Sequence, residues 1–215
     1  HQQQRLDGKM IKQSDIFLQG EGREWLRRNK SKIDIDNDPV LKMIKNADLQ
    51  PKRVLEIGCA DGWRLRELEK GYGCDVHGID TYAQPDSDVQ IDVGTADELA
   101  PCFDEDYDLV IYGFCLYLCD RKDLFSIAKE GDRVLADNGH IIIWDFLPLT
   151  AHKRPYAHDT RVTSFKMNYA NLWLGNPAYL PVRISIQDGD DLPNTRTSVV
   201  MLKKNVEAAW PQKSY

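Results

Sequence analysis

Residues 54–65 read VLEIGCADGWRL: an apolar run, then a turn with two glycines, then the start of a helical pattern. A continuous apolar run, as opposed to an alternating one, is typical of a parallel strand covered on both faces. Similar runs at 75–80, 88–93, 106–114 and 140–146 alternate with helical patterns. This alternation predicts an α/β fold with a parallel sheet and helices on both of its faces.

Capping residues predict where the helices begin and end. Asp38 and Pro39 have the character of an N-cap and a first helical residue, so a helix is expected to begin there and to end before Pro51. A second helix is expected from residue 61 with Gly71 just past its end. A third, over 120–139, is expected to be capped by Asp120.

The two ends of the chain have a different character. Residues 1–14 are polar and are expected to be disordered or to derive from an expression vector. Residues 15–50 are expected to form an N-terminal helical lid that includes a short helix around 24–30. Near the C-terminus, residues 182–187 and 197–204 have the pattern of two strands joined by a turn-rich segment.

The turn after the first apolar run has the pattern E-x-G-x-x-x-G, from Glu56 to Gly62. A dinucleotide site uses G-x-G-x-x-G, because its pyrophosphate lies against the amides of the turn. Here Ala60 stands where the middle glycine is expected, and the carboxylates of Glu56 and Asp61 flank the turn. Carboxylates repel a pyrophosphate and suit a ligand with a cationic part. A nicotinamide-dependent oxidoreductase is therefore disfavoured.

In order and spacing, four segments resemble the motifs of the class I S-adenosylmethionine-dependent methyltransferases. They are the turn just described, HGID ending at Asp80, DVGTADELA from Asp92, and DYDLVIYGFCLYL from Asp106. The resemblance covers about residues 50–146. It implies that S-adenosylmethionine is the cofactor and that S-adenosylhomocysteine is the product.

The resemblance also assigns a part of the cofactor to each segment. The turn would wrap the methionine and ribose portions, Asp80 would accept both ribose hydroxyls, the third segment would flank adenine, and the fourth would lead to the sulfonium. The implied residues are Glu56, Gly58, Cys59, Ala60, Asp61, Gly62, Asp80, Thr81, Thr95, Ala96, Asp97, Tyr112, Gly113 and Phe114, with Arg28 of the lid near the cofactor carboxylate.

Several of these assignments have purely structural alternatives. Tyr112 and Phe114 can be sheet core. Residues 95–97 can cap a short helix, and Arg28 can belong to an ordinary amphipathic helix. The fold that the resemblance implies is a Rossmann-like, seven-stranded, mostly parallel sheet with helices on both faces and an antiparallel last strand. The methyltransferase domain would then span 51–215, with an acceptor-side insertion at 147–196.

Residues 147–196 combine basic, histidine and aromatic side chains. Together with GEGREWLRRN near the N-terminus, they resemble more loosely the small bacterial and phage methyltransferases associated with surface-sugar and nonulosonic-acid biosynthesis. This resemblance implies a small, sugar-like acceptor. We hypothesise that His158 or His152 acts as general base and that Asp145 orients the acceptor or a histidine. The alternative for either histidine is a surface or loop position.

Two other functions compete with a small-molecule methyltransferase. A nucleic-acid or protein methyltransferase would dock its substrate on the Lys/Arg-rich segment 152–166, and its binding to RNA or DNA would depend strongly on salt. The net charge of 28 − 34 = −6 makes nucleic acid an unexpected partner. A non-catalytic cofactor-binding domain is the other alternative, and the intact turn and Asp80 argue against a loss of cofactor binding.

The five cysteines contain no Cys-x-x-Cys pair and no zinc spacing with histidine, so no metal site is expected. Thiols without a disulfide framework suggest a reducing compartment. No apolar run approaches the ~20 residues that span a bilayer, and no signal peptide is visible. The chain is therefore expected to be a cytoplasmic monomer or homodimer without membrane contact.

Overall fold

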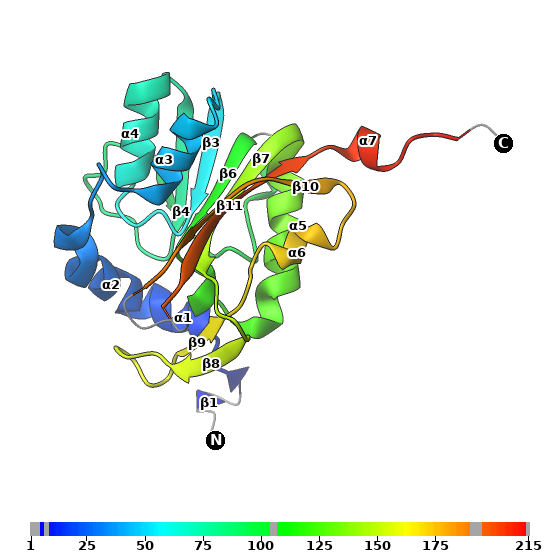
Figure 1. The fold of residues 1–215 in the computed structure, drawn as a ribbon. Helices are drawn as coiled ribbons and strands as arrows, with labels where there is room; N and C mark the ends of the chain where they lie inside the picture. Colours follow the sequence, from blue (N-terminus) through cyan, green and yellow to red (C-terminus); the bar gives the residue numbers. More distant parts are fainter. Residues whose placement is uncertain (1–4, 7–8, 104–106, 190–194, 214–215) are drawn as a thin grey trace.

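The computed structural model describes residues 5–6, 9–103, 107–189 and 195–213. Within them the main sheet has seven strands, drawn in Figure 1. In spatial order they are β10 (Tyr179–Gln187), β11 (Thr197–Lys204), β7 (Leu135–Phe146), β6 (Tyr107–Gly113), β3 (Arg53–Ile57), β4 (Asp75–Asp80) and β5 (Ile91–Val93). Strands β7 to β5 are mutually parallel, and β11 is antiparallel to both neighbours. The predicted Rossmann-like sheet with an antiparallel last strand is confirmed.

Helices cover both faces of this sheet, as Figure 1 shows. One face carries α3 (Pro39–Asn46) and α4 (Trp63–Tyr72), and the other carries α5 (Leu124–Val134) and α6 (Asn171–Leu174). Each face has its own core, because the near-continuous apolar strands present side chains to both. The buried helix residues are Val40, Ile44, Leu65 and Leu68 in the first core and Ile127, Val134 and Trp173 in the second.

The N-terminal segment packs against the carboxyl ends of the strands. Its elements are β1 (Arg5–Leu6), β2 (Lys9–Met10), α1 (Gln13–Ile16), a π turn (Phe17–Glu21), α2 (Gly22–Asn29) and a 3-10 turn (Lys30–Lys32). Gln13, within the stretch expected to be disordered, is buried. Its side-chain Nε2 donates to the carbonyl oxygens of Leu118 at 2.8 Å and Thr163 at 3.1 Å. These bonds tie the segment to residues more than a hundred positions away.

The 147–196 segment contains a hairpin that the sequence did not reveal. Strands β8 (His152–Pro155) and β9 (Thr163–Lys166) pair antiparallel outside the main sheet. The turn expected at 188–195 lies mostly outside the described residues. The remaining short elements are 3-10 turns at Pro101–Phe103, Leu116–Leu118 and Arg121–Asp123, and α7 (Val206–Ala209), which projects from the body in Figure 1. No helix in the described part of the chain is long and apolar enough to cross a membrane.

Helix ends test the capping predictions individually. Asp38 caps α3 as predicted, since its Oδ1 accepts from the Leu41 amide at 2.8 Å. The prediction for Gly71 is wrong: α4 continues to Tyr72, and Gly73, at φ +64°, supplies the left-handed residue that ends it. The prediction for Asp120 is also wrong. Its carboxylate accepts from the Gln13 amide at 2.7 Å, and α5 begins only at Leu124.

A buried ion-pair cluster joins α3, α4 and β3. The Arg64 guanidinium of α4 binds both oxygens of Asp38, at 3.1 Å and 2.8 Å, and also pairs with Glu56 of β3. All three side chains are buried. Buried charges are tolerated only when they are paired and hydrogen-bonded, so Arg64 makes the two buried carboxylates possible.

We predict that Arg64→Met lowers the free energy of unfolding by about 3–5 kcal/mol, because it leaves two buried carboxylates without a counter-ion. Urea unfolding followed by circular dichroism measures the change. Arg66→Met, two residues further along the same helix, is the matched control: Arg66 is one-third exposed and pairs with Asp61 and Asp88. Its cost should stay below about 1 kcal/mol. Equal costs for the two variants would contradict the role given to Arg64.

Candidate active site

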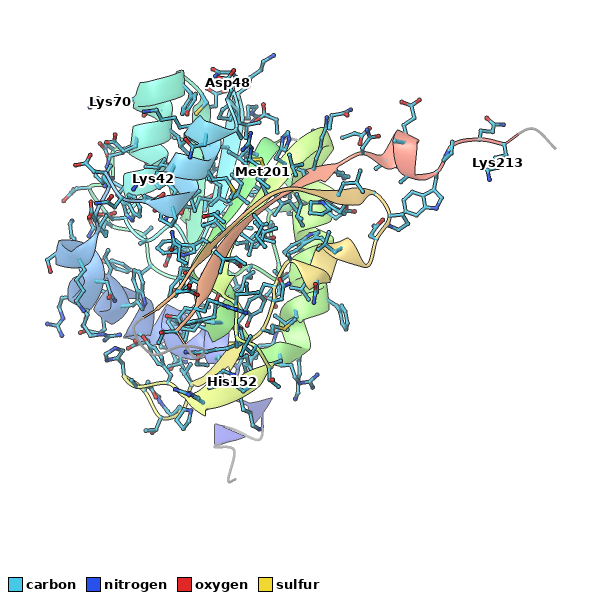
Figure 2. The ribbon with its side chains drawn as sticks, viewed as in Figure 1. Lys42, Asp48, Lys70, His152, Met201 and Lys213 are labelled. Atoms are coloured by element: carbon cyan, nitrogen blue, oxygen red, sulfur yellow. The ribbon has the colours of Figure 1, made fainter. Side chains whose placement is uncertain are left out.

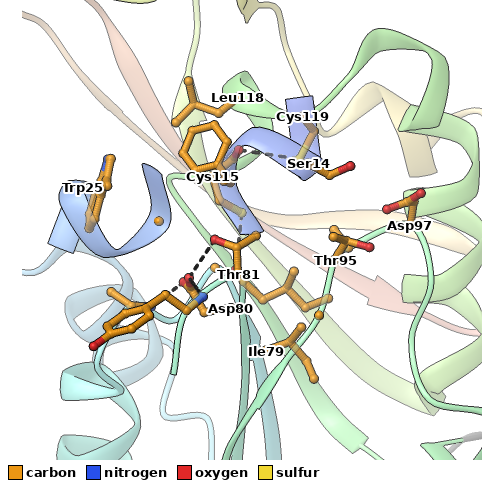
Figure 3. Close-up of a pocket in the computed structure, with 18 of the residues that line it drawn as sticks. Ser14, Trp25, Ile79, Asp80, Thr81, Thr95, Asp97, Cys115, Leu118 and Cys119 are labelled. Atoms are coloured by element: carbon orange, nitrogen blue, oxygen red, sulfur yellow. Dashed lines mark hydrogen bonds between the residues drawn. The ribbon is translucent and has the colours of Figure 1, made fainter. Parts of the chain in front are cut away.

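A cavity opens at the carboxyl ends of β3, β4 and β6, where β3 stands between β4 and β6 and the chain order of the strands reverses. Open α/β sheets bind ligands at such a switch point. Figure 3 shows this cavity, which we call the donor cavity. The sheet side of its wall includes Gly58, Ala60, Asp80, Thr81, residues 94–97 and residues 113–115, and the N-terminal segment covers it with Ser14, Phe17 and Trp25.

The turn after β3 brings backbone, not side chains, to the cavity. Gly58 has φ +74°, and a Cβ there would lie 2.5 Å from the Cβ of Cys115. The amides of Gly58 and Cys59 both donate to the carbonyl oxygen of Ile79 on β4. Ala60, at the position of the missing middle glycine, also has a left-handed backbone, with φ +55°. The turn therefore keeps the conformation that glycine would favour, at the steric cost of one methyl group.

Asp80 lies at the end of β4 with its carboxylate in the donor cavity. One oxygen accepts from the Ala60 amide at 2.8 Å, and the other accepts from the Tyr82 amide at 3.1 Å. Burial raises the pKa of Asp80, and these hydrogen bonds oppose that rise. The oxygen that accepts from Tyr82 also accepts from the Thr81 hydroxyl at 3.3 Å. That hydroxyl can rotate away, so each carboxylate oxygen can accept a ligand hydroxyl. Asp80 can therefore bind two neighbouring hydroxyl groups, as a ribose presents.

The loop after β5 forms the opposite wall, with Thr95, Ala96 and Asp97. Thr95 pairs with Glu98 in an isolated β-bridge, so residues 95–99 form a tight turn where the alternative reading expected a capped helix. The floor beside this loop is apolar, with Ile79, Leu118 and Ile127. An apolar floor with polar groups at its edge suits a flat heteroaromatic ring such as adenine.

A second cavity adjoins the first and shares Trp25, Gly58, Ala60, Gly113 and Phe114 with it. It reaches down to Glu56, Cys59 and Arg64. Burial raises the pKa of Glu56 to about 7, although the charge of Arg64 lowers it.

One oxygen of the Glu56 carboxylate accepts no hydrogen bond from the described residues. Oε1 pairs with Arg64, whereas Oε2 is buried and has no hydrogen-bond partner in the described part of the chain. An unpartnered buried carboxylate oxygen is costly, and a cationic donor would satisfy it. The ammonium of the methionine portion of S-adenosylmethionine is such a donor, so the residues present fit this cofactor.

A family model described as a methyltransferase domain matches residues 26–179. The chain belongs to this family. Its fold is that of the class I S-adenosylmethionine-dependent methyltransferases, and its cofactor is S-adenosylmethionine. No curated protein matches the sequence.

Solved methyltransferase structures share the fold of this methyltransferase. One is the 1,6-didemethyltoxoflavin-N1-methyltransferase of Burkholderia thailandensis, with bound 1,6-didemethyltoxoflavin and S-adenosylhomocysteine (TM-score 0.66, 13% identity, 93% of each chain covered). Another is the N-methyltransferase NodS of Bradyrhizobium japonicum WM9 in complex with S-adenosylhomocysteine (TM-score 0.58, 15% identity, 89% of this chain and 96% of that chain covered). At these identities the likeness concerns the fold.

Three residues that sequence reasoning assigned to the cofactor lie outside both cavities. Asp61 pairs with Lys30 at 3.3 Å and with Arg66 at 3.4 Å. Gly62 starts α4 with φ +77°. Tyr112 is fully buried, and its hydroxyl donates to the Ile127 carbonyl oxygen at 3.4 Å. The structure thus gives these residues roles in the turn and the core.

Arg28 also lies outside both cavities. Its guanidinium pairs with Glu21 and contacts the hydroxyl of Tyr156 at 3.3 Å, which in turn bonds Glu21 at 3.2 Å. The group joins the N-terminal segment to the loop between β8 and β9. Arg28 therefore holds the cover of the donor cavity in place, whereas sequence reasoning expected it near the cofactor carboxylate.

The structure does not bring the two histidines to either cavity. His152 lies on the β8–β9 hairpin, as Figure 2 shows, and its Nδ1 lies 2.9 Å from the Thr150 carbonyl oxygen. His158 is exposed, and its ring packs edge-on to Tyr156. These are the surface and loop positions of the alternative reading.

Asp145 is buried below the surface of the site, and burial raises its pKa to about 7. Its oxygens accept from the amides of Phe146 at 2.7 Å and Tyr117 at 3.2 Å. These bonds fix the 3-10 turn at Leu116–Leu118 against the end of β7. Asp145 therefore positions the turn after β6 through its backbone bonds.

Several cavity residues carried no sequence signal. Cys115 and Cys119 pack against the core and also line the donor cavity. Ser14 and Phe17 line it from a stretch with no recognisable motif. Gln13, whose partners lie 105 and 150 residues away, helps to fix that stretch in place. Contacts of such sequence separation leave no pattern in a local window.

We predict that Asp80→Asn weakens S-adenosylhomocysteine binding about 10- to 100-fold, because hydrogen bonds to a charged acceptor are worth roughly 1.5–3 kcal/mol. Isothermal titration calorimetry measures the dissociation constant. Asp88→Asn, whose side chain is 71% exposed, is the control and should leave binding unchanged. Unchanged binding in Asp80→Asn would show that the ribose lies elsewhere.

We also predict that the affinity for S-adenosylhomocysteine rises about tenfold from pH 6 to pH 8. The ligand ammonium binds the ionised form of Glu56, whose pKa in the free protein is raised to about 7, so binding releases a proton below that pH. Calorimetric titration at several pH values measures the dependence, which Glu56→Gln should remove. Asp145→Asn, which alters another carboxyl with a pKa of about 7, should retain it. If both variants lost the pH dependence of S-adenosylhomocysteine affinity, the assignment of that dependence to Glu56 would be contradicted.

Proposed function

We propose that this methyltransferase methylates a small, sugar-like or otherwise polar acceptor. One observation carries the proposal: the donor cavity and the second cavity meet at Trp25, Gly58, Ala60, Gly113 and Phe114. A cofactor in the first cavity would reach Glu56 in the second, and an acceptor in the rest of the second cavity would meet it at these residues. Trp25, from the N-terminal segment, lines both, and two adjoining cavities of this kind suit a small molecule better than a polymer.

The chain's own residues would hold the cofactor and exclude water. S-adenosylmethionine, when bound, supplies an electrophilic methyl group on its sulfonium, and S-adenosylhomocysteine remains after transfer. Asp80 would accept the ribose hydroxyls and Glu56 the ammonium, while Phe17 and Trp25 shield the donor cavity. Holding donor and acceptor in line converts an encounter in solution into a reaction within one site, which is the main source of acceleration for such a displacement.

An acceptor hydroxyl must also lose its proton during transfer. Sequence reasoning proposed His152 or His158 for this task, with Asp145 as an orienting group. Because neither histidine lines a cavity and Asp145 is held by backbone amides, our proposal places the proton transfer on none of them.

We further propose that the enzyme works in the cytoplasm as a monomer or homodimer. Cys59, Cys74, Cys115 and Cys119 are free thiols. Burial raises the pKa of each, which keeps them in the less reactive thiol form. Free thiols are typical of a reducing compartment and support this location.

The proposal predicts which cell fraction contains the acceptor. Incubation of the enzyme and S-adenosylmethionine with a filtered small-molecule extract should form S-adenosylhomocysteine, measured by mass spectrometry. Purified RNA, DNA and total protein should yield no more than the slow background, and Asp80→Asn should remove the product from the active fraction. If S-adenosylhomocysteine formed only with RNA, DNA or protein, the proposal of a small-molecule acceptor would be wrong.

A further inference from the structure

Apart from Glu56 and Arg64, the second cavity is lined by residues of several separate segments, and we call the part lined by Trp25, Asn29, Phe114, Trp144 and Gln187 its outer part. Trp25 and Asn29 lie on α2, Phe114 follows β6, Trp144 lies near the end of β7, and Gln187 ends β10. The proposed function assigns an acceptor to the second cavity, and the residues of this outer part indicate the chemical class of that acceptor.

Trp144 gives the first indication of what belongs there. Its indole Nε1 is buried, lines this cavity, and has no hydrogen-bond partner within the described residues. The ring is fixed from two sides, by Phe114 at a centroid distance of 5.0 Å and by the Arg64 guanidinium at 5.8 Å. An indole N–H that is buried without a partner is disfavoured. A ligand oxygen in the cavity would satisfy it.

Phe114 is the second indication. It is one of four described non-glycine residues with a positive φ, at +66°, and its amide donates to the Trp144 carbonyl oxygen at 2.8 Å. A bulky residue in the left-handed region is strained, and such strain gathers at functional sites. The strained turn places Phe114 on the wall common to the two cavities, where donor and acceptor would meet.

The third indication is the hydrogen-bonding capacity of two polar side chains in the outer part, Asn29 and Gln187. Asn29 donates its amide to the Trp25 carbonyl oxygen at 2.8 Å, so its own oxygen keeps acceptor capacity. Gln187 accepts from the Thr197 hydroxyl at 3.3 Å, so its amide hydrogens keep donor capacity. Donors and acceptors interleaved with indole and phenyl faces suit a ring with several hydroxyl groups, since each hydroxyl both donates and accepts.

We propose that this outer part, the acceptor pocket, binds a hydroxylated ring such as a sugar or sugar acid, with the Trp144 indole N–H donating to one of its oxygens. The inference rests on the proposed function, because it takes the donor cavity to hold the cofactor. It places the acceptor on the α3 side of the sheet, between α2 and the end of β10. The β8–β9 hairpin with its two histidines is then not the acceptor site.

Indole resonances provide a direct test. The chain has five tryptophans, so a protein labelled with ¹⁵N-tryptophan gives a small set of indole signals. Trp144→Phe assigns the signal of Trp144 while keeping a ring in the core. The protein is first saturated with S-adenosylhomocysteine and then titrated with D-glucose, D-glucuronate and UDP-glucose. Cyclohexanecarboxylate, a ring with a carboxylate and no hydroxyl groups, is the matched probe.

At least one hydroxylated probe should shift the Trp144 signal and leave Trp173 unmoved. Trp173 is the internal control, because its Nε1 is also buried without a described partner but lines neither cavity. Trp144→Phe should weaken binding of that probe about five-fold, the worth of one hydrogen bond, and leave S-adenosylhomocysteine binding within two-fold.

Two results would overturn the acceptor pocket. One is a Trp144 signal that none of the hydroxylated probes moves, and the other is an equal shift with cyclohexanecarboxylate. The proposed function fails separately and earlier, if S-adenosylhomocysteine itself leaves the signal of Trp25, a residue of the donor cavity, unchanged.

Discussion

The site depends on a single cation, the guanidinium of Arg64, which pairs with two buried carboxylates, those of Asp38 and Glu56. Asp38 caps α3 with the same carboxylate that binds Arg64, so the start of α3 and the first turn of α4 are joined. Glu56 attaches both to β3. This arrangement fixes the floor of the second cavity, and it carries one more negative than positive charge when both carboxylates are ionised. A cationic ligand restores the balance, so the stabilising cluster also selects the ligand.

In the proposed binding mode, different physical means would hold the two ends of the cofactor. Glu56 offers charge from inside the sheet, whereas Asp80 offers hydrogen-bond capacity at the end of the neighbouring strand. The turn from Gly58 to Ala60 lies between them and contributes backbone. The N-terminal segment covers the donor cavity. The hydrogen bonds of Gln13 and the group of Glu21, Arg28 and Tyr156 attach this segment to the rest of the protein.

Sequence reasoning predicted what local patterns encode. The strand runs predicted the sheet, the Asp38–Pro39 pair predicted the start of α3, and the E-x-G-x-x-x-G pattern predicted the turn that borders the donor cavity. The rest required knowledge of three-dimensional contacts. Arg64 looked like an ordinary helix residue, and only the fold shows that it faces two carboxylates. His152 and His158 lie on the β8–β9 hairpin, outside both cavities. The position of this hairpin depends on contacts between distant residues, such as Gln13 with Thr163, which no local sequence pattern shows. Arg28 was expected near the cofactor carboxylate, but in the structure its guanidinium pairs with Glu21.

The central claim is that one ligand spans Glu56 and Asp80, and a crystal structure of the chain with S-adenosylhomocysteine tests it most directly. The account predicts the ligand ammonium within hydrogen-bond distance of Glu56 Oε2 and both ribose hydroxyls on the Asp80 carboxylate. A ligand whose amino-acid portion lies away from Glu56, or whose ribose lies away from Asp80, would contradict it.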